Sequence, residues 1–268
     1  MAVVSASDAG KGPATYRCRR GRGLEEGRGG ATSVVDDPER AKQVAARHGV
    51  ERVRDGMRLA LGTGSTAAAA VRALHERYPT GSFDCVSSSR ATEELARSLG
   101  ISVRSLRADD RFDVMLDGAD EVTPTLDLTK GGGGALLREK LLARLSREVV
   151  ILVDPSKLVD RLGSKAPIPV EVVPFARTVL AHRFEHEGYR VRHRVATDGR
   201  PYLTDNGNEI LDLTPPRPLE DPAVTLASLS GATGVVEVGL FVGLASLVIV
   251  GYPDGHAEER TRPPPRTA

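Results

Sequence analysis

The segment MRLALGTGSTAAAAVRALHER, residues 57–77, indicates the fold class of this chain. Residues 57–61 form a short apolar run of the kind that becomes a buried strand. The glycine-containing loop GTGST, 62–66, follows, and the alanine-rich stretch 67–77 favours a helix. A strand that passes through a short loop into a helix is the repeating unit of parallel α/β sheets.

The same alternation continues on both sides of this segment. A helix is expected from about 38 to 48, with Asp37 as its N-cap and Pro38 at its first position. Further strands are expected at 84–87, 101–105, 112–116 and 148–153, and further helices at 90–99 and 135–145. We therefore predict an α/β fold with a Rossmann-like, mainly parallel sheet and helices on both faces.

The sequence pattern changes after residue 166. Candidate antiparallel strands alternate with two helices, and the turn Asp205-Asn-Gly-Asn208 is typical of a hairpin. The apolar run 247–251 is expected to return to the first sheet. We predict an α/β catalytic domain made of 36–166 plus 240–255, and a smaller α+β domain over 167–239.

The two ends of the chain differ from the rest. Residues 1–35 are rich in Gly, Arg, Ala and Ser without an apolar period, which favours a disordered extension over a basic arm or a transit peptide. Residues 256–268 contain three consecutive prolines and many charges, and we expect a frayed tail.

Composition narrows the class of protein. The 268 residues are 40% hydrophobic and 27% charged, with a formal net charge of +1, which gives no reason to expect nucleic acid as a partner. Cys18 and Cys85 suggest neither a disulfide framework nor a metal site. No apolar run approaches the roughly 18 residues of a membrane-spanning helix. We expect a cytoplasmic protein.

Two loops that follow strands could bind a ligand. In Gly62-Thr-Gly-Ser-Thr66, glycines and the free amides of the next helix would suit a phosphate, although a tight turn with a Ser/Thr cap explains the pattern equally well. The loop matches neither a Walker A motif nor the dinucleotide fingerprint. For Ser87-Ser-Ser89 we favour capping of the next helix.

The acidic segment Asp117-Gly-Ala-Asp120-Glu121 directly follows an apolar strand. Carboxylates at the carboxyl end of a strand can pass protons between neighbouring hydroxyls. An ordinary acidic turn and a divalent-metal site are the alternatives, although no nearby histidine supports a metal.

The run Lys130-Gly-Gly-Gly-Gly134 is less ordinary, because four consecutive glycines are costly to order. Their amides can form an anion-binding nest, and Lys130 adds a positive charge. Arg138-Glu139-Lys140 follows at the start of a helix. Glu139 could serve there as a base, although a solvated helix face is the usual reading of such a triplet. Lys157 follows another strand, and alone it would be read as a surface lysine.

Taken together, these segments resemble type A ribose-5-phosphate isomerase over about residues 36–255. The resemblance rests on eight ordered blocks: GTGST (62–66), SSSRAT (87–92), LDGADEV (116–122), KGGGGALLREK (130–140), VDPSK (153–157), PIPVEVVPFAR (167–177), TDNGNEILD (204–212) and GVVEVGLF (234–241). The turn after Phe241 departs from the family, because it is one residue shorter and lacks an acidic residue.

The resemblance implies interconversion of D-ribose 5-phosphate and D-ribulose 5-phosphate in the non-oxidative pentose phosphate pathway, without a metal or nucleotide cofactor. It also implies a homodimer or a dimer-based tetramer. Glu139 becomes the base, and Asp117, Asp120 and Lys130 become its catalytic partners. The substrate-binding residues that it implies are Lys42, Thr63, Gly64, Ser65, Thr66, Asp117, Gly118, Ala119, Asp120, Lys130, Gly131, Gly132, Gly133 and Lys157.

The mechanism that follows is a hypothesis. Glu139 moves a proton between C1 and C2 through a cis-enediolate, while Lys130 and the glycine amides stabilise the oxyanion. Asp117 and Asp120 bind hydroxyls, and Ser65 and Thr66 hold the phosphate. The rival interpretations are a non-catalytic sugar-phosphate sensor, an amino-sugar-phosphate isomerase and an acyl-CoA transferase.

Overall fold

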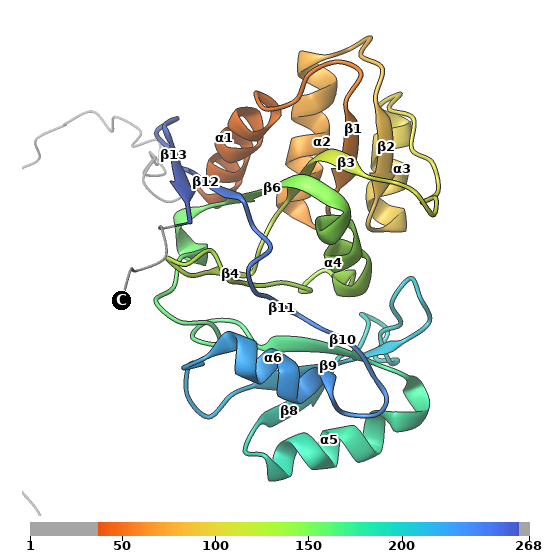
Figure 1. Cartoon of the computed structure of the whole chain (residues 1–268), viewed down its shortest axis with the longest axis vertical. Helices are drawn as coiled ribbons and strands as arrows, with labels where there is room; N and C mark the ends of the chain where they lie inside the picture. The colour runs from red at the N-terminus through yellow and green to blue at the C-terminus, as the bar shows by residue number, and fades with distance from the viewer. Residues whose placement is uncertain (1–36, 263–268) are drawn as a thin grey trace, which may run out of the picture. The chain divides into compact units, whose positions relative to one another are not determined.

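The computed structural model describes residues 37–262. The extension predicted for 1–35 and the last part of the predicted tail, 263–268, lie outside these residues. Within them the chain forms one six-stranded sheet, one four-stranded sheet and one three-stranded sheet (Figure 1).

The six-stranded sheet confirms the predicted α/β fold. Its strand order is β13-β12-β6-β3-β1-β2, and every neighbouring pair is parallel except β12 with β13. Its strands are β1 (Arg58–Leu61), β2 (Asp84–Ser87), β3 (Phe112–Asp117), β6 (Ser146–Val153), β12 (Leu247–Gly251) and β13 (Ala257–Thr261). The apolar run 247–251 returns beside β6, as predicted.

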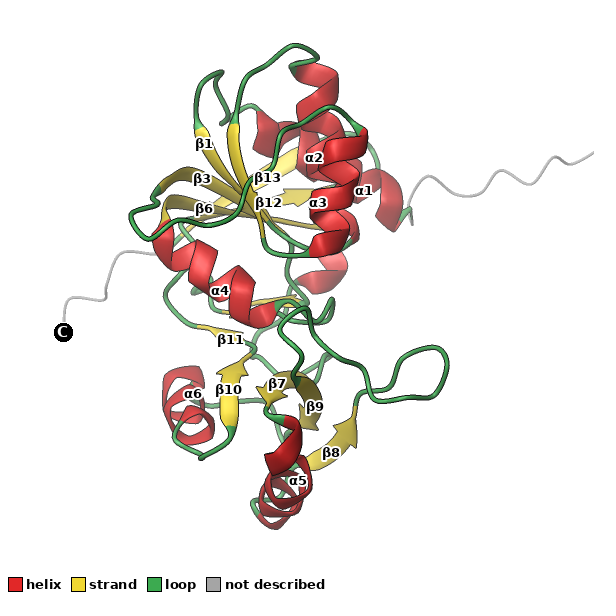
Figure 2. Ribbon diagram, turned by 90° about the vertical axis from the view of Figure 1, so that its right-hand side faces the viewer, coloured by secondary structure: helices red, strands yellow, loops and turns green. Residues whose placement is uncertain are grey.

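Helices cover both faces of this sheet (Figure 2). They are α1 (Pro38–Val50), α2 (Ser65–Arg77), α3 (Arg90–Ser98) and α4 (Leu136–Leu145). Alternate residues of each strand point to opposite faces. Leu59 and Leu61 pack in one apolar core with α1, α2 and α3, whereas Ala60 packs in a second core with α4. The predicted N-cap of α1 is confirmed, because the Asp37 carboxylate accepts from the amide of Arg40 at 3.1 Å.

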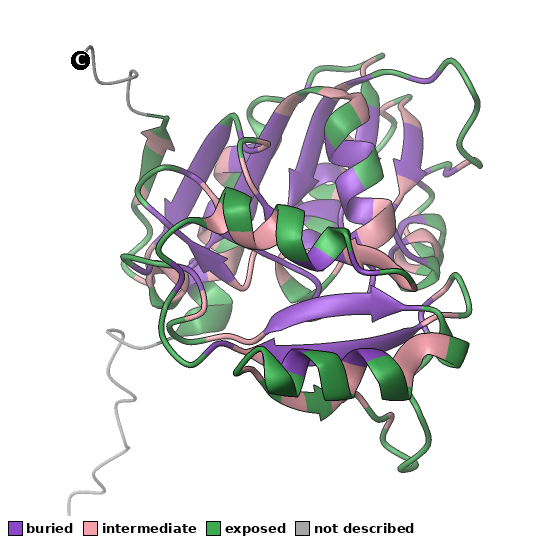
Figure 3. Cartoon of the chain, turned by 60° about the horizontal axis from the view of Figure 1, so that its bottom comes forward, coloured by how far each residue is buried: buried purple, intermediate pink, exposed green. Residues whose placement is uncertain are grey.

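A four-stranded antiparallel sheet follows in the chain. Its order is β10-β7-β9-β8. It is built from β7 (Ile168–Val172), β8 (Arg190–His193), β9 (Glu209–Thr214) and β10 (Val235–Val238), with α5 (Arg177–His186) and α6 (Pro222–Ser230). Its strands β7 and β9 carry almost only buried residues (Figure 3). Residues 201–204 form no strand and contribute only a single bridge, between Val195 and Pro201.

A third, small sheet lies next to α4 in the second core. It consists of β4 (Glu121–Val122), β5 (Leu128–Thr129) and β11 (Leu240–Phe241). The shortened turn after Phe241 is well supported in this structure. The amide of Gly243 donates to Asp127 Oδ1 at 3.0 Å, and Ser246 exchanges hydrogen bonds with the backbone of Val149.

Two expectations were wrong. Of the strand predicted at 101–105, only Val103 pairs with its neighbour, β2; the side chain of Arg104 instead binds Asp84 and Asp110. The predicted frayed tail includes β13, which pairs with β12 throughout its length. Gly255, with φ of +102°, closes the hairpin between them. Because β13 is a half-exposed edge strand of mainly polar residues, it lacks the apolar pattern that predicts a strand.

Gly251 allows α1 to approach β12 closely. A Cβ atom at this position would lie 2.2 Å from the carbonyl oxygen of Ala41 and 2.5 Å from the amide nitrogen of Ala45. Both atoms belong to the backbone of α1, so relief would require the whole helix to move.

We therefore expect Gly251→Ala to lower the free energy of unfolding by about 2–3 kcal/mol, as is typical of overpacking. Gly231→Ala is the matched control, because a Cβ there would be 3.4 Å from its nearest neighbour and φ is −73°. Urea denaturation of both variants would measure the difference. Equal midpoints for the two variants would contradict close packing of α1 on β12.

Candidate active site

The candidate loops meet at the carboxyl edge of the parallel sheet, around a cavity of about 110 Å³. Such an edge is the usual place for a ligand in an open α/β sheet. With one exception, every site residue implied by the resemblance lines this cavity. The lining residues are Lys42, Thr63, Gly64, Ser65, Thr66, Gly118, Ala119, Asp120, Lys130, Gly131, Gly132, Gly133, Glu139 and Lys157.

The exception is Asp117, which is completely buried and does not line the cavity. It lies against Gly62, where a Cβ atom would be 2.0 Å from Asp117 Oδ1. The same oxygen accepts hydrogen bonds from the amides of Thr63 at 3.2 Å and Gly118 at 2.8 Å. Asp117 therefore joins the loop after β1 to the loop after β3 through hydrogen bonds made by a buried carboxylate.

The loop 62–66 presents a helix terminus to the cavity. Gly64, with φ of +100°, is the N-cap of α2, and no side chain caps the helix. The alternative of a Ser/Thr cap is therefore not what the structure contains. The first amides of α2 and the hydroxyls of Ser65 and Thr66 remain available to an anion.

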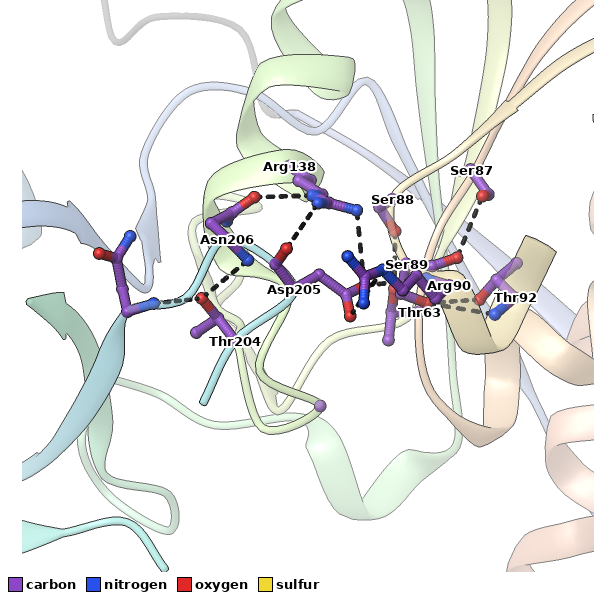
Figure 4. A network of polar contacts seen from close by, with 12 residues as sticks. Thr63, Ser87, Ser88, Ser89, Arg90, Thr92, Arg138, Thr204, Asp205 and Asn206 are labelled. Atoms are coloured by element: carbon purple, nitrogen blue, oxygen red, sulfur yellow. Dashed lines mark hydrogen bonds and ion pairs between the residues drawn. The ribbon is translucent and has the colours of Figure 1, made fainter. Parts of the chain in front are cut away.

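The serine run after β2 has a supporting role. Ser89 caps α3, as predicted, by accepting from the amide of Thr92 at 3.2 Å. The hydroxyl of Ser88 lies 2.7 Å from that of Thr63, so this run braces the loop 62–66 (Figure 4). Neither serine lines the cavity.

Lys130, at the centre of the site, is almost completely buried. Its Nζ lies 2.9 Å from Asp117 Oδ2 and 3.5 Å from Glu139 Oε1, and donates to the carbonyl oxygen of Gly118 at 2.6 Å. The second oxygen of Glu139, Oε2, has no hydrogen-bond partner among the described residues. A buried carboxylate oxygen that borders a cavity and lacks a partner is available to take a proton.

This cluster changes the acidity of its members. The pKa of Glu139 is raised to about 8, chiefly by burial and in addition by the nearby charges of Asp117 and Asp120, against the opposing attraction of Lys130. Burial likewise raises the pKa of Asp117. Burial alone would lower the pKa of Lys130, but the carboxylates of Asp117 and Glu139 outweigh it and keep the ammonium charged.

The three residues Arg138, Glu139 and Lys140 point in different directions, which excludes a common solvated face. Glu139 borders the cavity, whereas Lys140 is buried and its Nζ binds Glu237 and the carbonyl oxygen of Val238, each at 2.6 Å. Arg138 donates to Asn206 Oδ1 at 2.8 Å and to the carbonyl oxygen of Asp205 at 2.9 Å (Figure 4). Arg138 and Lys140 thus hold α4 against the antiparallel sheet.

The glycine run completes the opposite wall. The amide of Gly132 donates to Asp120 Oδ2 at 2.8 Å, and a side chain at Gly132 would collide with this carboxylate.

Lys157 lies in a short 3₁₀ turn, Pro155–Lys157, that Asp154 caps. Lys42 reaches the cavity from α1 and also pairs with Glu39. Three lysines from separate elements therefore line one small cavity, which suits a multiply charged anion.

Sequence reasoning missed two residues that touch the glycine run, Arg194 and Tyr202. Both come from the antiparallel sheet region, and no local motif marks them. The predicted alternative of a metal site has no support in the described part of the chain, where no three His, Cys, Asp or Glu side chains are grouped to hold a metal ion. None of the helices between residues 37 and 262 has the length and apolarity to cross a membrane.

Known proteins resemble this chain over most of its length. Residues 84–255 match the family described as ribose 5-phosphate isomerase A, or phosphoriboisomerase A. Ribose-5-phosphate isomerase A of Chloroflexus aurantiacus is 47% identical over 220 residues, which cover 81% of this chain and 92% of that relative. The enzyme of the same name from Thermomicrobium roseum is 48% identical over 219 residues, with the same coverage of both chains.

Solved structures agree with the sequence relatives. Ribose 5-phosphate isomerase A of Methanocaldococcus jannaschii superposes with a TM-score of 0.78 at 36% identity, over 83% of this chain and 99% of that one. A D-ribose-5-phosphate isomerase in complex with phospho-erythronic acid superposes with a TM-score of 0.80 at 35% identity, over 85% and 100%. By sequence and by fold, this chain belongs to the ribose 5-phosphate isomerase A family.

Proposed function

We propose that this protein interconverts D-ribose 5-phosphate and D-ribulose 5-phosphate through a cis-enediolate. The observation that carries the proposal is Glu139, whose unpartnered carboxylate oxygen borders a cavity walled by anion-binding loops. Membership of the family supports the same reaction. The proposal requires one base that serves two adjacent carbons, and Glu139 is the carboxylate whose pKa suits that task near neutral pH.

In the direction from aldose to ketose, Glu139 removes the proton from C2 of the open-chain sugar. The electrons of that C–H bond form the C1–C2 double bond, and the carbonyl oxygen on C1 becomes an oxyanion. Glu139 then returns the proton to C1. The proton of the C2 hydroxyl passes to the oxyanion on C1, so that C2 becomes the ketone and C1 a primary alcohol. No electron acceptor is needed, since the oxidation of C2 balances the reduction of C1.

The remaining residues have separate roles in this proposal. Lys130 and the glycine amides stabilise the oxyanion, and Asp120 binds hydroxyls at the cavity wall. The burial of Asp117 favours a positioning role, in which it holds Lys130 charged and in place. Ser65, Thr66, the amides of α2, Lys42 and Lys157 receive the phosphate, so that C1 and C2 reach Glu139.

The wider setting is also a proposal. We place the reaction in the non-oxidative branch of the pentose phosphate pathway, in the cytoplasm, and the protein as a homodimer or dimer-based tetramer. Light scattering of the purified protein would distinguish these assemblies from a monomer.

We expect Glu139→Gln to reduce kcat about 10³-fold, because the amide cannot accept the carbon-bound proton. Glu94→Gln, on the exposed side of α3, is the matched control and should retain wild-type turnover. Formation of ribulose 5-phosphate would be measured with EDTA present. A folded Glu139→Gln variant with near-normal kcat would remove Glu139 from the mechanism.

The pH profile offers an independent test. Because Glu139 acts as a base with a pKa raised to about 8, kcat/KM should increase with pH through the range 7–8 and then level off. An acid limb with its midpoint near pH 4.5, the ordinary value for glutamate, would contradict this assignment.

The same raised pKa predicts an effect on stability. Between about pH 4.5 and 8 the folded protein binds more protons at Glu139 than the unfolded chain does, so its contribution to stability falls as pH rises. Glu139→Gln removes this penalty and should raise the free energy of unfolding at pH 8 by on the order of 1–3 kcal/mol relative to its effect at pH 4. Urea denaturation at both pH values would measure it. A variant with the same effect at both pH values would show that Glu139 has an ordinary pKa.

A further inference from the structure

Arg194, just after β8, reaches from the antiparallel sheet to the glycine run. Its Nη1 donates to the carbonyl oxygen of Gly131 at 2.8 Å and to that of Gly132 at 3.1 Å. Only 14% of its side chain is exposed. The resemblance assigns no role to Arg194, and Arg194 does not line the cavity.

The two carbonyl contacts decide which way the loop amides point. In a planar trans peptide, the carbonyl and the N–H of the next residue point in opposite directions. Because the carbonyl of Gly132 points toward Arg194, the N–H of Gly133 points away from it. Gly133 lines the cavity and Arg194 does not, so this orientation turns the amide toward the cavity side of the loop.

The neighbouring amides are already occupied. The amide of Gly132 donates to Asp120 Oδ2 at 2.8 Å, and that of Gly134 donates to the carbonyl of Gly131 at 3.0 Å. Among the amides of Gly132, Gly133 and Gly134, only that of Gly133 lacks an acceptor within the described residues. It is therefore the amide of these three that is free to bind an oxyanion.

The guanidinium is itself fixed by surrounding groups. Its Nε lies 3.1 Å from Asp212 Oδ2, and its Nη2 binds the other oxygen of the same carboxylate. Asp212, on β9, is only 1% exposed. The ring of Tyr202 lies 5.9 Å from the guanidinium carbon, and its hydroxyl donates to the carbonyl of Gly133 at 3.3 Å. A planar guanidinium that binds a carboxylate on one side and two carbonyls on the other has little freedom to rotate.

We infer that Arg194 is a positioning residue for the isomerisation, because it orients the Gly133 amide toward the oxygen that becomes negatively charged in the enediolate. This inference rests on the proposed function. It assigns to the antiparallel sheet a part in the reaction, through a residue that does not touch the substrate.

Arg194→Lys tests the inference. Lysine keeps a positive charge beside Asp212 but cannot bridge this carboxylate and two carbonyls with one planar group. Arg192→Lys is the matched control, since Arg192 also pairs with Asp212, at 3.1 Å, but its side chain is 75% exposed and it makes no hydrogen bond to the glycine run.

We expect Arg194→Lys to lower kcat by about 10²-fold with a much smaller change in KM, as when a catalytic donor is misplaced. Phospho-erythronic acid carries a carboxylate in place of the negatively charged enediolate oxygen, and inhibition by it should weaken about 10-fold. Inhibition by inorganic phosphate, which probes only the phosphate-binding part of the site, should not change. Arg192→Lys should match the wild-type protein in all three measurements.

Wild-type kcat and inhibitor affinity in a folded Arg194→Lys variant would overturn the inference. Equal losses in Arg194→Lys and Arg192→Lys would also overturn it, because they would place the effect in Asp212 pairing alone. If Arg194→Lys folds poorly, Asp212→Asn decides, with a smaller loss of kcat and the same selective weakening of phospho-erythronic acid expected. Failure of the proposed function is recognised separately, as a wild-type protein that binds phospho-erythronic acid but does not convert ribose 5-phosphate.

Discussion

The buried ammonium of Lys130 is the interaction on which the rest of the site depends. A charge removed from water is costly unless partners and hydrogen bonds replace the solvent, and Lys130 has the carboxylates of Asp117 and Glu139 and the carbonyl of Gly118. Two carboxyl groups share this single ammonium, so ionisation of both would leave an excess of negative charge. Burial, together with that repulsion, raises the pKa of Glu139 and prepares it to accept a proton near neutral pH. The interaction that holds the site together therefore also sets the strength of its base.

The fold determines how these three residues meet. Asp117 ends β3, Lys130 follows β5, and Glu139 lies in the first half of α4. The glycine run between Lys130 and α4 lets the chain turn back within a few residues, so that both ends of the segment face the same cavity. Lys140, the residue after Glu139, is pulled the opposite way by Glu237 and the carbonyl of Val238. Since neighbouring helix residues point in different directions, this contact helps to aim Glu139 at the cavity.

Much of the fold and the position of the site could be predicted from the sequence, because strand–helix alternation and glycine loops are local signals. The parallel sheet, its carboxyl edge and the cap at Ser89 followed from such signals. The role proposed for Glu139 did not, since its local pattern equally suits a solvated helix face and only the family resemblance distinguished it. The contacts of Arg194 with residues 131 and 132 could not be predicted from the sequence, because 63 and 62 positions separate the partners in the chain. The strand β13 was missed for another reason, since an edge strand of mainly polar residues lacks an apolar pattern.

The two sides of the site thus contribute different kinds of electrostatic support. The side formed by β3, β5 and α4 supplies net charge, through Lys130 and the carboxylates of Asp117 and Glu139. The antiparallel sheet region supplies an orientation, since Arg194 neutralises Asp212 and turns a peptide group that carries no net charge. A dipole fixed in advance stabilises a developing oxyanion without the reorganisation that water would need. It also leaves the charge balance around Lys130 untouched, so the donor at Gly133 can strengthen oxyanion binding without lowering the raised pKa on which Glu139 depends. A second buried cation in the same place would lower that pKa and weaken the base.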